Sequence, residues 1–178
     1  VGILDADASL HFSDYRSSER TFQLITQVAG RCGRSEAAGK VVLQTYSPDN
    51  AVLRRAINYD YEGFFRHEIS VRKATGFPPY TEIVRVMVAG EDETAAIEVA
   101  KKIYTDVSVL YKTDRAKFAF LGCMKAPLKK LQGKFRYQIL MRISDSDNSV
   151  KDFAAACADK YKTNKVNAYI EVNPNNLT

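Results

Sequence analysis

The spacing of apolar residues in the first part of the chain predicts a mixture of short strands and amphipathic helices. Residues 1–4 form a brief apolar run typical of a buried strand. Residues 17–30 repeat apolar side chains at helical spacing, with Phe22 and Ile25 facing a core, and we expect Gly30 to end this helix. The further elements expected here are a strand at 39–46 and helices at about 49–57 and 60–76.

A double proline, Pro78 and Pro79, follows these helices, and the pattern changes after it. Proline does not continue a helix, so we expect a domain boundary there, with domains at 1–79 and 80–178. The second half reads strand, helix, strand, strand, helix, strand, a βαββαβ order that predicts a ferredoxin-like α/β domain. The expected elements are 81–89, 92–111, 117–123, 135–143, 148–161 and 165–172, with a basic loop between the second and third strands.

The composition indicates a folded protein that is not secreted. Apolar residues make up 46% of the 178 positions, no run is long enough to cross a membrane, and no secretory leader is readable. The chain has three cysteines, Cys32, Cys123 and Cys157, and no two of them are close in sequence. This spacing argues against a disulfide framework and against a zinc site. We therefore expect a cytoplasmic location, and because the chain begins with Val1 inside an apolar run, we expect a fragment of a longer protein.

The net charge of +5 is concentrated in one stretch of the second half. Between residues 125 and 142 the chain has no acidic residue, and its basic residues are Lys125, Lys129, Lys130, Lys134, Arg136 and Arg142. A cluster of this kind neutralises DNA phosphates, and the neighbouring Phe135 and Tyr137 suit stacking on unpaired bases. The alternative is that the aromatic rings point into a core, as strand alternation favours. The lysines remain candidates for contact with the DNA backbone.

The segment QVAGRCGR, residues 27–34, places Arg31 and Arg34 at the end of a helix, each preceded by glycine. A guanidinium stays protonated and presents a planar set of donors that fits phosphate oxygens, and glycine lets the backbone approach a ligand closely. A nucleotide phosphate is therefore a natural target. The alternative is a solvated helix end or a flexible glycine-arginine tail, but this pair follows an amphipathic helix and precedes a strand.

This segment resembles motif VI of superfamily 2 helicases. Together with the sequence before it from Leu4, the junction GFPPY and the stretches FRYQILMR and EVNPNNL, it is similar to the carboxyl-terminal part of the PriA family of replication-restart helicases. The resemblance covers nearly the whole chain in the right order. It implies the latter part of a second RecA-like helicase lobe, followed by the ferredoxin-like domain.

The resemblance also implies a role for each residue of the motif. Arg34 would be an arginine finger on the γ-phosphate of ATP, Arg31 would assist on the phosphates or couple the lobes, and Gln27 would lie at the lobe interface. ATP and Mg²⁺ would be held mainly by a first lobe, because this sequence has no GxxxxGK[ST] phosphate loop and no Walker-B-like acidic motif. We expect this chain alone to be inactive in ATP hydrolysis.

We expect no metal site, for zinc or for any other ion, within this chain. The zinc-binding cysteines of the family have no counterpart here, so zinc would belong to the parent protein only. Asp5 and Asp7 end the first strand without a third ligand nearby, and we interpret them as structural.

The implied partners are forked and single-stranded DNA, single-stranded DNA-binding protein and other primosome proteins, with no membrane. The DNA contacts would come from Lys129, Lys130, Lys134 and Arg136. Two alternatives stay open: a non-enzymatic module that binds nucleic acid or protein through one basic surface, and another superfamily 2 DNA helicase such as a RecG-like one.

Overall fold

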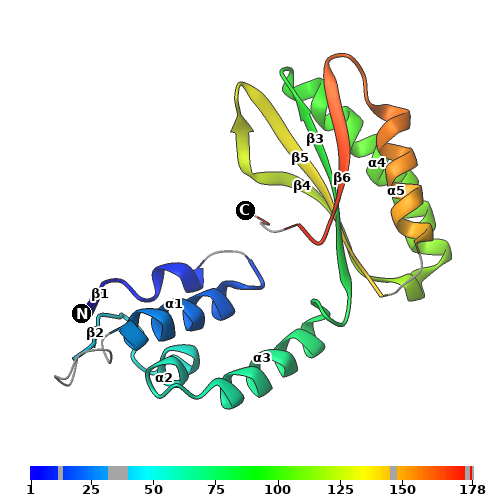
Figure 1. Ribbon diagram of the computed structural model, residues 1–178. Coiled ribbons are helices and arrows are strands. Elements are labelled where there is room, and N and C mark those ends of the chain that lie inside the picture. The colour runs from blue at the N-terminus through cyan, green and yellow to red at the C-terminus, as the bar shows by residue number, and fades with distance from the viewer. Residues whose placement is uncertain (12–13, 32–39, 145–147, 175–176, 178) are drawn as a thin grey trace. The chain divides into compact units, whose positions relative to one another are not determined.

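The computed structural model describes residues 1–11, 14–31, 40–144, 148–174 and 177 (Figure 1). The chain divides into two compact units, Val1–Ala74 and Thr75–Thr178, here called unit 1 and unit 2. Both combine helices with strands, so the expected α/β class is confirmed. Among these residues no helix has the length and apolar character that a membrane span requires.

Unit 1 consists mainly of helices around a minimal parallel pair of strands. The strands β1 and β2 pair through Gly2 with Val42 and Ile3 with Leu43, so each is shorter than the sequence predicts. The elements are β1 (Gly2–Ile3), a 3₁₀ helix (Ala8–His11), α1 (Ser17–Arg31), β2 (Val42–Leu43), α2 (Ala51–Ile57) and α3 (Tyr61–Thr75).

The expected helix end at Gly30 is wrong, because α1 continues through Gly30 to Arg31. Glycine ends a helix by entering the left-handed region, and Gly30 is not among the described glycines with positive φ. The consequence is that Arg31 belongs to the helix and its direction is set by the helical backbone.

The core of unit 1 joins the three longer helices. Phe22 of α1 stacks on Phe64 of α3 with ring centroids 4.4 Å apart. Ile25 and Leu53 are among its most buried side chains, at 2% and 1% exposure. The expected core positions Phe22 and Ile25 are confirmed, and they hold α1 in place.

Unit 2 has a four-stranded sheet in the order β4-β5-β3-β6, in which all neighbours are antiparallel. The two long helices lie together on one face of this sheet (Figure 1). The elements are β3 (Glu82–Gly90), α4 (Glu93–Thr113), a 3₁₀ turn (Arg115–Lys117), β4 (Phe118–Leu131), β5 (Lys134–Ile143), α5 (Ser149–Tyr161) and β6 (Val166–Val172).

Strand alternation produces the core of unit 2. Val84, Val86 and Val88 on β3 and Ile139 and Met141 on β5 are fully buried. They form one cluster with the apolar stripe of α4. The stripe that the sequence predicts is confirmed, and its members are Ala96, Val99, Ile103, Val107 and Leu110.

The expected basic loop is wrong, because this region forms the end of a long hairpin. The strand β4 runs to Leu131, and β5 begins at Lys134. Gln132 and Gly133 have φ of 49° and 79°, as in the two-residue turns that match strand twist. The strand β4 leaves its register with β5 after Lys125 and regains it at Lys130, so the residues between them form a β-bulge.

Candidate functional site

The last turn of α1 presents two of the three residues expected at the nucleotide. Gln27 and Arg31 are four residues apart, so they lie on the same side of the helix, and both are exposed. They border one surface hollow together with Thr26 and Gly30. Within the described ranges, no hydrogen bond or ion pair joins either side chain to another residue. Both are therefore free to bind a partner.

The third expected residue, Arg34, lies outside the described residues, together with Cys32 and Gly33. The structure therefore brings Gln27 and Arg31 together and leaves the position of Arg34 as a prediction.

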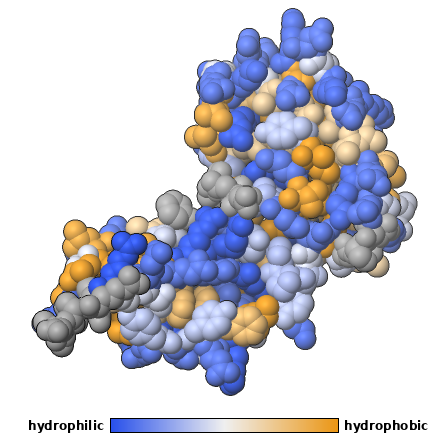
Figure 2. Space-filling view, in the orientation of Figure 1, coloured by the Kyte–Doolittle hydropathy of each residue, from blue (hydrophilic) through white to orange (hydrophobic). Residues whose placement is uncertain are grey.

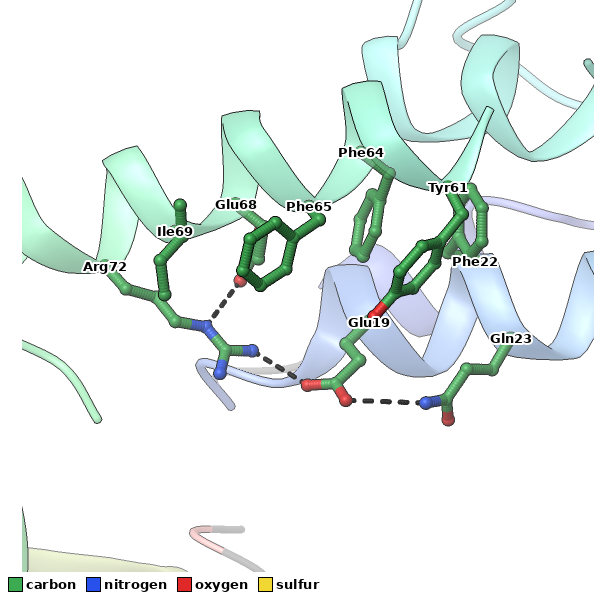
Figure 3. A pocket seen from close by; sticks show the side chains of 9 residues that line it. All are labelled: Glu19, Phe22, Gln23, Tyr61, Phe64, Phe65, Glu68, Ile69 and Arg72. Atoms are coloured by element: carbon green, nitrogen blue, oxygen red, sulfur yellow. Dashed lines mark hydrogen bonds and ion pairs between the residues drawn. The ribbon is translucent and has the colours of Figure 1, made fainter. Parts of the chain in front are cut away.

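Near the start of α1, a half-buried arginine of α3 fastens the two helices together (Figure 3). The guanidinium of Arg72 donates to Glu68 Oε1 and to Glu19 Oε2, each at 2.9 Å. Burial opposes the charge of Arg72, but the hydrogen bonds to Glu68 and Glu19 outweigh it and raise the pKa of the guanidinium. Arg72 therefore remains a charged link that fixes the helix carrying Gln27 and Arg31.

Aromatic side chains complete the contact between α1 and α3. A small cavity of about 170 Å³ lies between these helices. Phe22 and Phe64 form its buried side, while Tyr61 and Phe65 point into it from α3 and remain exposed (Figure 3). The sequence gives no signal for this arrangement, because Glu19 and Arg72 are separated by 53 positions.

Asp7 has the structural role that the sequence suggests. Its carboxylate is buried and accepts hydrogen bonds from Thr45 Oγ1 at 2.7 Å and from the Tyr46 amide at 2.6 Å. These bonds, chiefly that from Thr45, lower the pKa of Asp7 despite burial. Asp5 is exposed, and no group of potential metal ligands gathers among the described residues.

The base of the hairpin in unit 2 is held by Glu93, the first residue of α4. Its Oε1 accepts hydrogen bonds from Lys125 Nζ and Tyr137 Oη, both at 2.8 Å. These two bonds lower the pKa of Glu93, with Lys125 contributing most. The ring of Tyr137 is buried in the core, as strand alternation favours, so it does not offer a stacking surface.

The four candidate DNA-binding residues of the hairpin are not equivalent. Lys130 lies over the ring of Phe135, with its Nζ 4.5 Å from the centroid. Lys129 and Lys134 are exposed, and Arg136 is half-buried. No ion pair joins Lys129, Lys134 or Arg136 to an acidic residue in the described part of the chain. These three cations are therefore the most available to phosphate.

Arg142, the last cation of the basic stretch, contributes to the packing of unit 2. Its guanidinium lies 4.6 Å from the ring centroid of Phe77 and 5.0 Å from that of Phe120. It also donates to the carbonyl oxygens of Thr75 and Gly76. Burial lowers its pKa. Sequence reasoning missed this role, because its partners lie far away along the chain.

Comparison with known proteins gives a consistent result. A family model described as the primosomal protein N C-terminal domain matches residues 73–175. The Replication restart protein PriA of Bacillus subtilis is 38% identical over 142 residues, 80% of this chain and 17% of the relative. The proteins of the same name from Rickettsia typhi and Chlamydia trachomatis are 36% and 30% identical over 86% and 97% of this chain, and 22% of each relative. The chain thus spans about a fifth of their length.

Proposed function

The chain belongs to the PriA family of replication restart proteins, and on this premise we propose that it is part of an ATP-dependent DNA helicase that restarts replication at stalled or forked DNA. Unit 1 is then the latter part of a second RecA-like lobe, a proposal supported by its parallel strand pair with flanking helices. Unit 2 is a ferredoxin-like domain, supported by the strand order β4-β5-β3-β6 and the helices on one sheet face.

The motor role rests on one observation, the exposed pair Gln27 and Arg31 at the end of α1. The Arg31 guanidinium has no partner among the described residues, and its helix is fixed by Arg72 and Phe22, so it suits a phosphate delivered by another lobe. Arg34, three residues further along, is the proposed arginine finger, and Arg31 assists on the phosphates or couples the lobes. Gln27 lies at the lobe interface.

The chemistry that these residues serve is phosphoryl transfer. ATP and Mg²⁺ are bound mainly by the first lobe, and zinc binds elsewhere in the parent protein. A positioned arginine stabilises the negative charge that develops on the transferring phosphoryl group, an effect worth about 10³ to 10⁵ in rate in other systems. The side chains of this chain contribute donors and positive charge at that phosphate.

The hairpin of unit 2 is the proposed DNA contact. Lys129, Lys134 and Arg136 are available cations, and Lys130 adds charge beside the ring of Phe135. Such contacts hold the phosphate backbone with little sequence preference. Forked and single-stranded DNA, single-stranded DNA-binding protein and other primosome proteins are the proposed partners, in the cytoplasm at the nucleoid.

The test uses the full-length protein with Arg34→Ala and, separately, Arg31→Ala. We expect Arg34→Ala to reduce DNA-stimulated ATP hydrolysis by about a thousandfold or more and to leave DNA affinity largely unchanged. Arg31→Ala should reduce turnover less. Arg66→Ala is a matched control, because Arg66 is an exposed arginine of unit 1 that pairs with Glu62.

Unchanged turnover in the Arg34 variant would refute the motor assignment. If DNA binding also proved to depend on the hairpin cations, the alternative of a non-enzymatic nucleic-acid-binding module would replace it.

A further inference from the structure

The end of the β4–β5 hairpin combines lysines with exposed leucines. Residues 127–134 are all exposed. Leu128 and Leu131 are exposed to 49% and 46%, and they flank Lys129 and Lys130 in sequence. In Figure 2 apolar atoms lie among hydrophilic ones at the margin of unit 2 where Figure 1 draws this hairpin. Electrostatic contact with phosphates explains the lysines but not the leucines.

The strand register gives the hairpin two different faces. Lys130 pairs with Phe135, and the contact between lysine and ring confirms that they share one face. Leu131 pairs with Lys134, so these two side chains share the other face. Alternation along β5 places Arg136 on that same face as Lys134. An exposed leucine therefore stands beside two available cations.

The turn makes this end of the hairpin narrow. Gln132 and Gly133 both have positive φ, and a Cβ at Gly133 would meet no atom within 4 Å, so the turn is open to solvent. Between Lys125 and Lys130 the bulged part of β4 carries Leu128 away from regular pairing. A narrow tip with apolar side chains suits contact with the edge or face of a base pair.

The sheet face opposite the two helices is a poorer candidate for base contact. On that face β3 presents Met87 and β5 presents Gln138, which are paired neighbours with only 1% and 4% exposure. Neither central strand presents an aromatic residue there, whereas sheets that bind single strands stack bases on central aromatics. The hairpin end, where exposed leucines lie beside lysines, is therefore the better candidate for base contact.

We propose that Leu128 and Leu131 contact the exposed bases at the junction where duplex DNA opens into single strands, while Lys129 and Lys134 bind the flanking phosphates. The inference rests on the proposed DNA-binding function and adds recognition of the junction to it. Apolar side chains such as leucine can insert between base steps and partly unstack them, so they suit bases at a junction. The surrounding charge favours DNA over a protein partner, because the chain has no acidic residue from 115 to 144.

The test compares wild type with the double variant Leu128→Ser and Leu131→Ser in the whole chain. The probe is a synthetic DNA fork with 2-aminopurine at the first paired position, beside a plain duplex of the same paired sequence. We expect wild type to change the 2-aminopurine fluorescence and the double variant to lose that change. The ratio of fork affinity to duplex affinity should fall by about tenfold, the scale of losing one base contact.

Two controls separate this inference from a general loss of binding or folding. Val109→Ser removes an exposed apolar side chain of α4, at 59% exposure, and should leave the fork signal unchanged. Leu131→Ser alone gives a smaller perturbation and should show part of the effect. Because no charge is removed, the salt dependence of fork binding should stay at its wild-type slope.

The outcomes distinguish the two proposals. If the leucine variant binds the fork as wild type does while neutralising Lys129 and Lys134 flattens the salt dependence, only the junction contact is overturned. If neutralising the lysines changes nothing, the hairpin is not the DNA contact and the proposed function of unit 2 fails. If the leucine variant instead loses only binding to a protein partner, the junction contact is also overturned.

Discussion

Neutralising Lys129 and Lys134, two exposed lysines of the hairpin, should reduce the salt dependence of DNA binding by an amount that can be calculated. The change is Lys129→Gln together with Lys134→Gln. Both side chains are exposed and have no ion-pair partner in the described part of the chain, so removing their charge leaves no acid uncompensated. Lys125 is left in place because it also supports the hairpin through Glu93.

The magnitude follows from counterion release. Each lost phosphate contact lowers the slope of log affinity against log salt by about 0.7 to 0.9, so two contacts lower it by about 1.4 to 1.8. Over a fourfold rise in salt, binding of the variant should therefore weaken about sevenfold to twelvefold less than that of wild type.

The assay is fluorescence anisotropy with labelled forked DNA over a series of salt concentrations. Lys101→Gln with Lys102→Gln is the matched control, because these exposed lysines of α4 remove the same charge away from the hairpin. An unchanged slope in the hairpin variant, or an equal fall in the control, would refute the assignment of these lysines to phosphate.

Two further predictions concern the side-chain packing that supports the two candidate sites. Phe64→Ala should destabilise unit 1 by about 3 to 5 kcal/mol, because a stacked core ring at 4% exposure is removed. Phe65→Ala, at 49% exposure, should cost much less in the same urea titration followed by circular dichroism. Glu93 has a lowered pKa in the folded state, so its stabilisation is present above the ordinary glutamate pKa and is lost as the pH falls through the lowered value. Glu93→Gln should remove this pH dependence from urea titrations, and an identical pH profile in the variant would contradict the Glu93 contacts.

Local patterns in the sequence are sufficient to predict most helices and strands of unit 2. The stripe from Ala96 to Leu110 and the alternation on β3 and β5 predict elements that agree with the structure to within a few residues. The lysines and leucines of the hairpin end do not alternate, and the bulge after Lys125 disrupts the period of two, so the sequence predicts a loop where the structure has a strand. The residue type of Gly30 predicts a helix end, although a glycine can remain helical.

The candidate sites are harder to predict from the sequence than the helices and strands. The exposure of Gln27 and Arg31 agrees with their expected availability, while the role of Arg34 remains a prediction. Among the basic residues, the sequence could not separate Arg142, which packs on two rings, from Lys129 and Lys134, which have no ion-pair partner among the described residues. That distinction depends on side chains brought together by folding, and no local pattern encodes it.

The position of Arg142 also bears on how unit 2 is best produced as a separate polypeptide. A cloning boundary placed after Pro79 would delete Thr75, Gly76 and Phe77, which supply two acceptors and one ring to this arginine. The half-buried guanidinium would then keep its contact with Phe120 but lose the ring of Phe77 and both carbonyl oxygens. An expression fragment that begins before Thr75 retains all of these contacts.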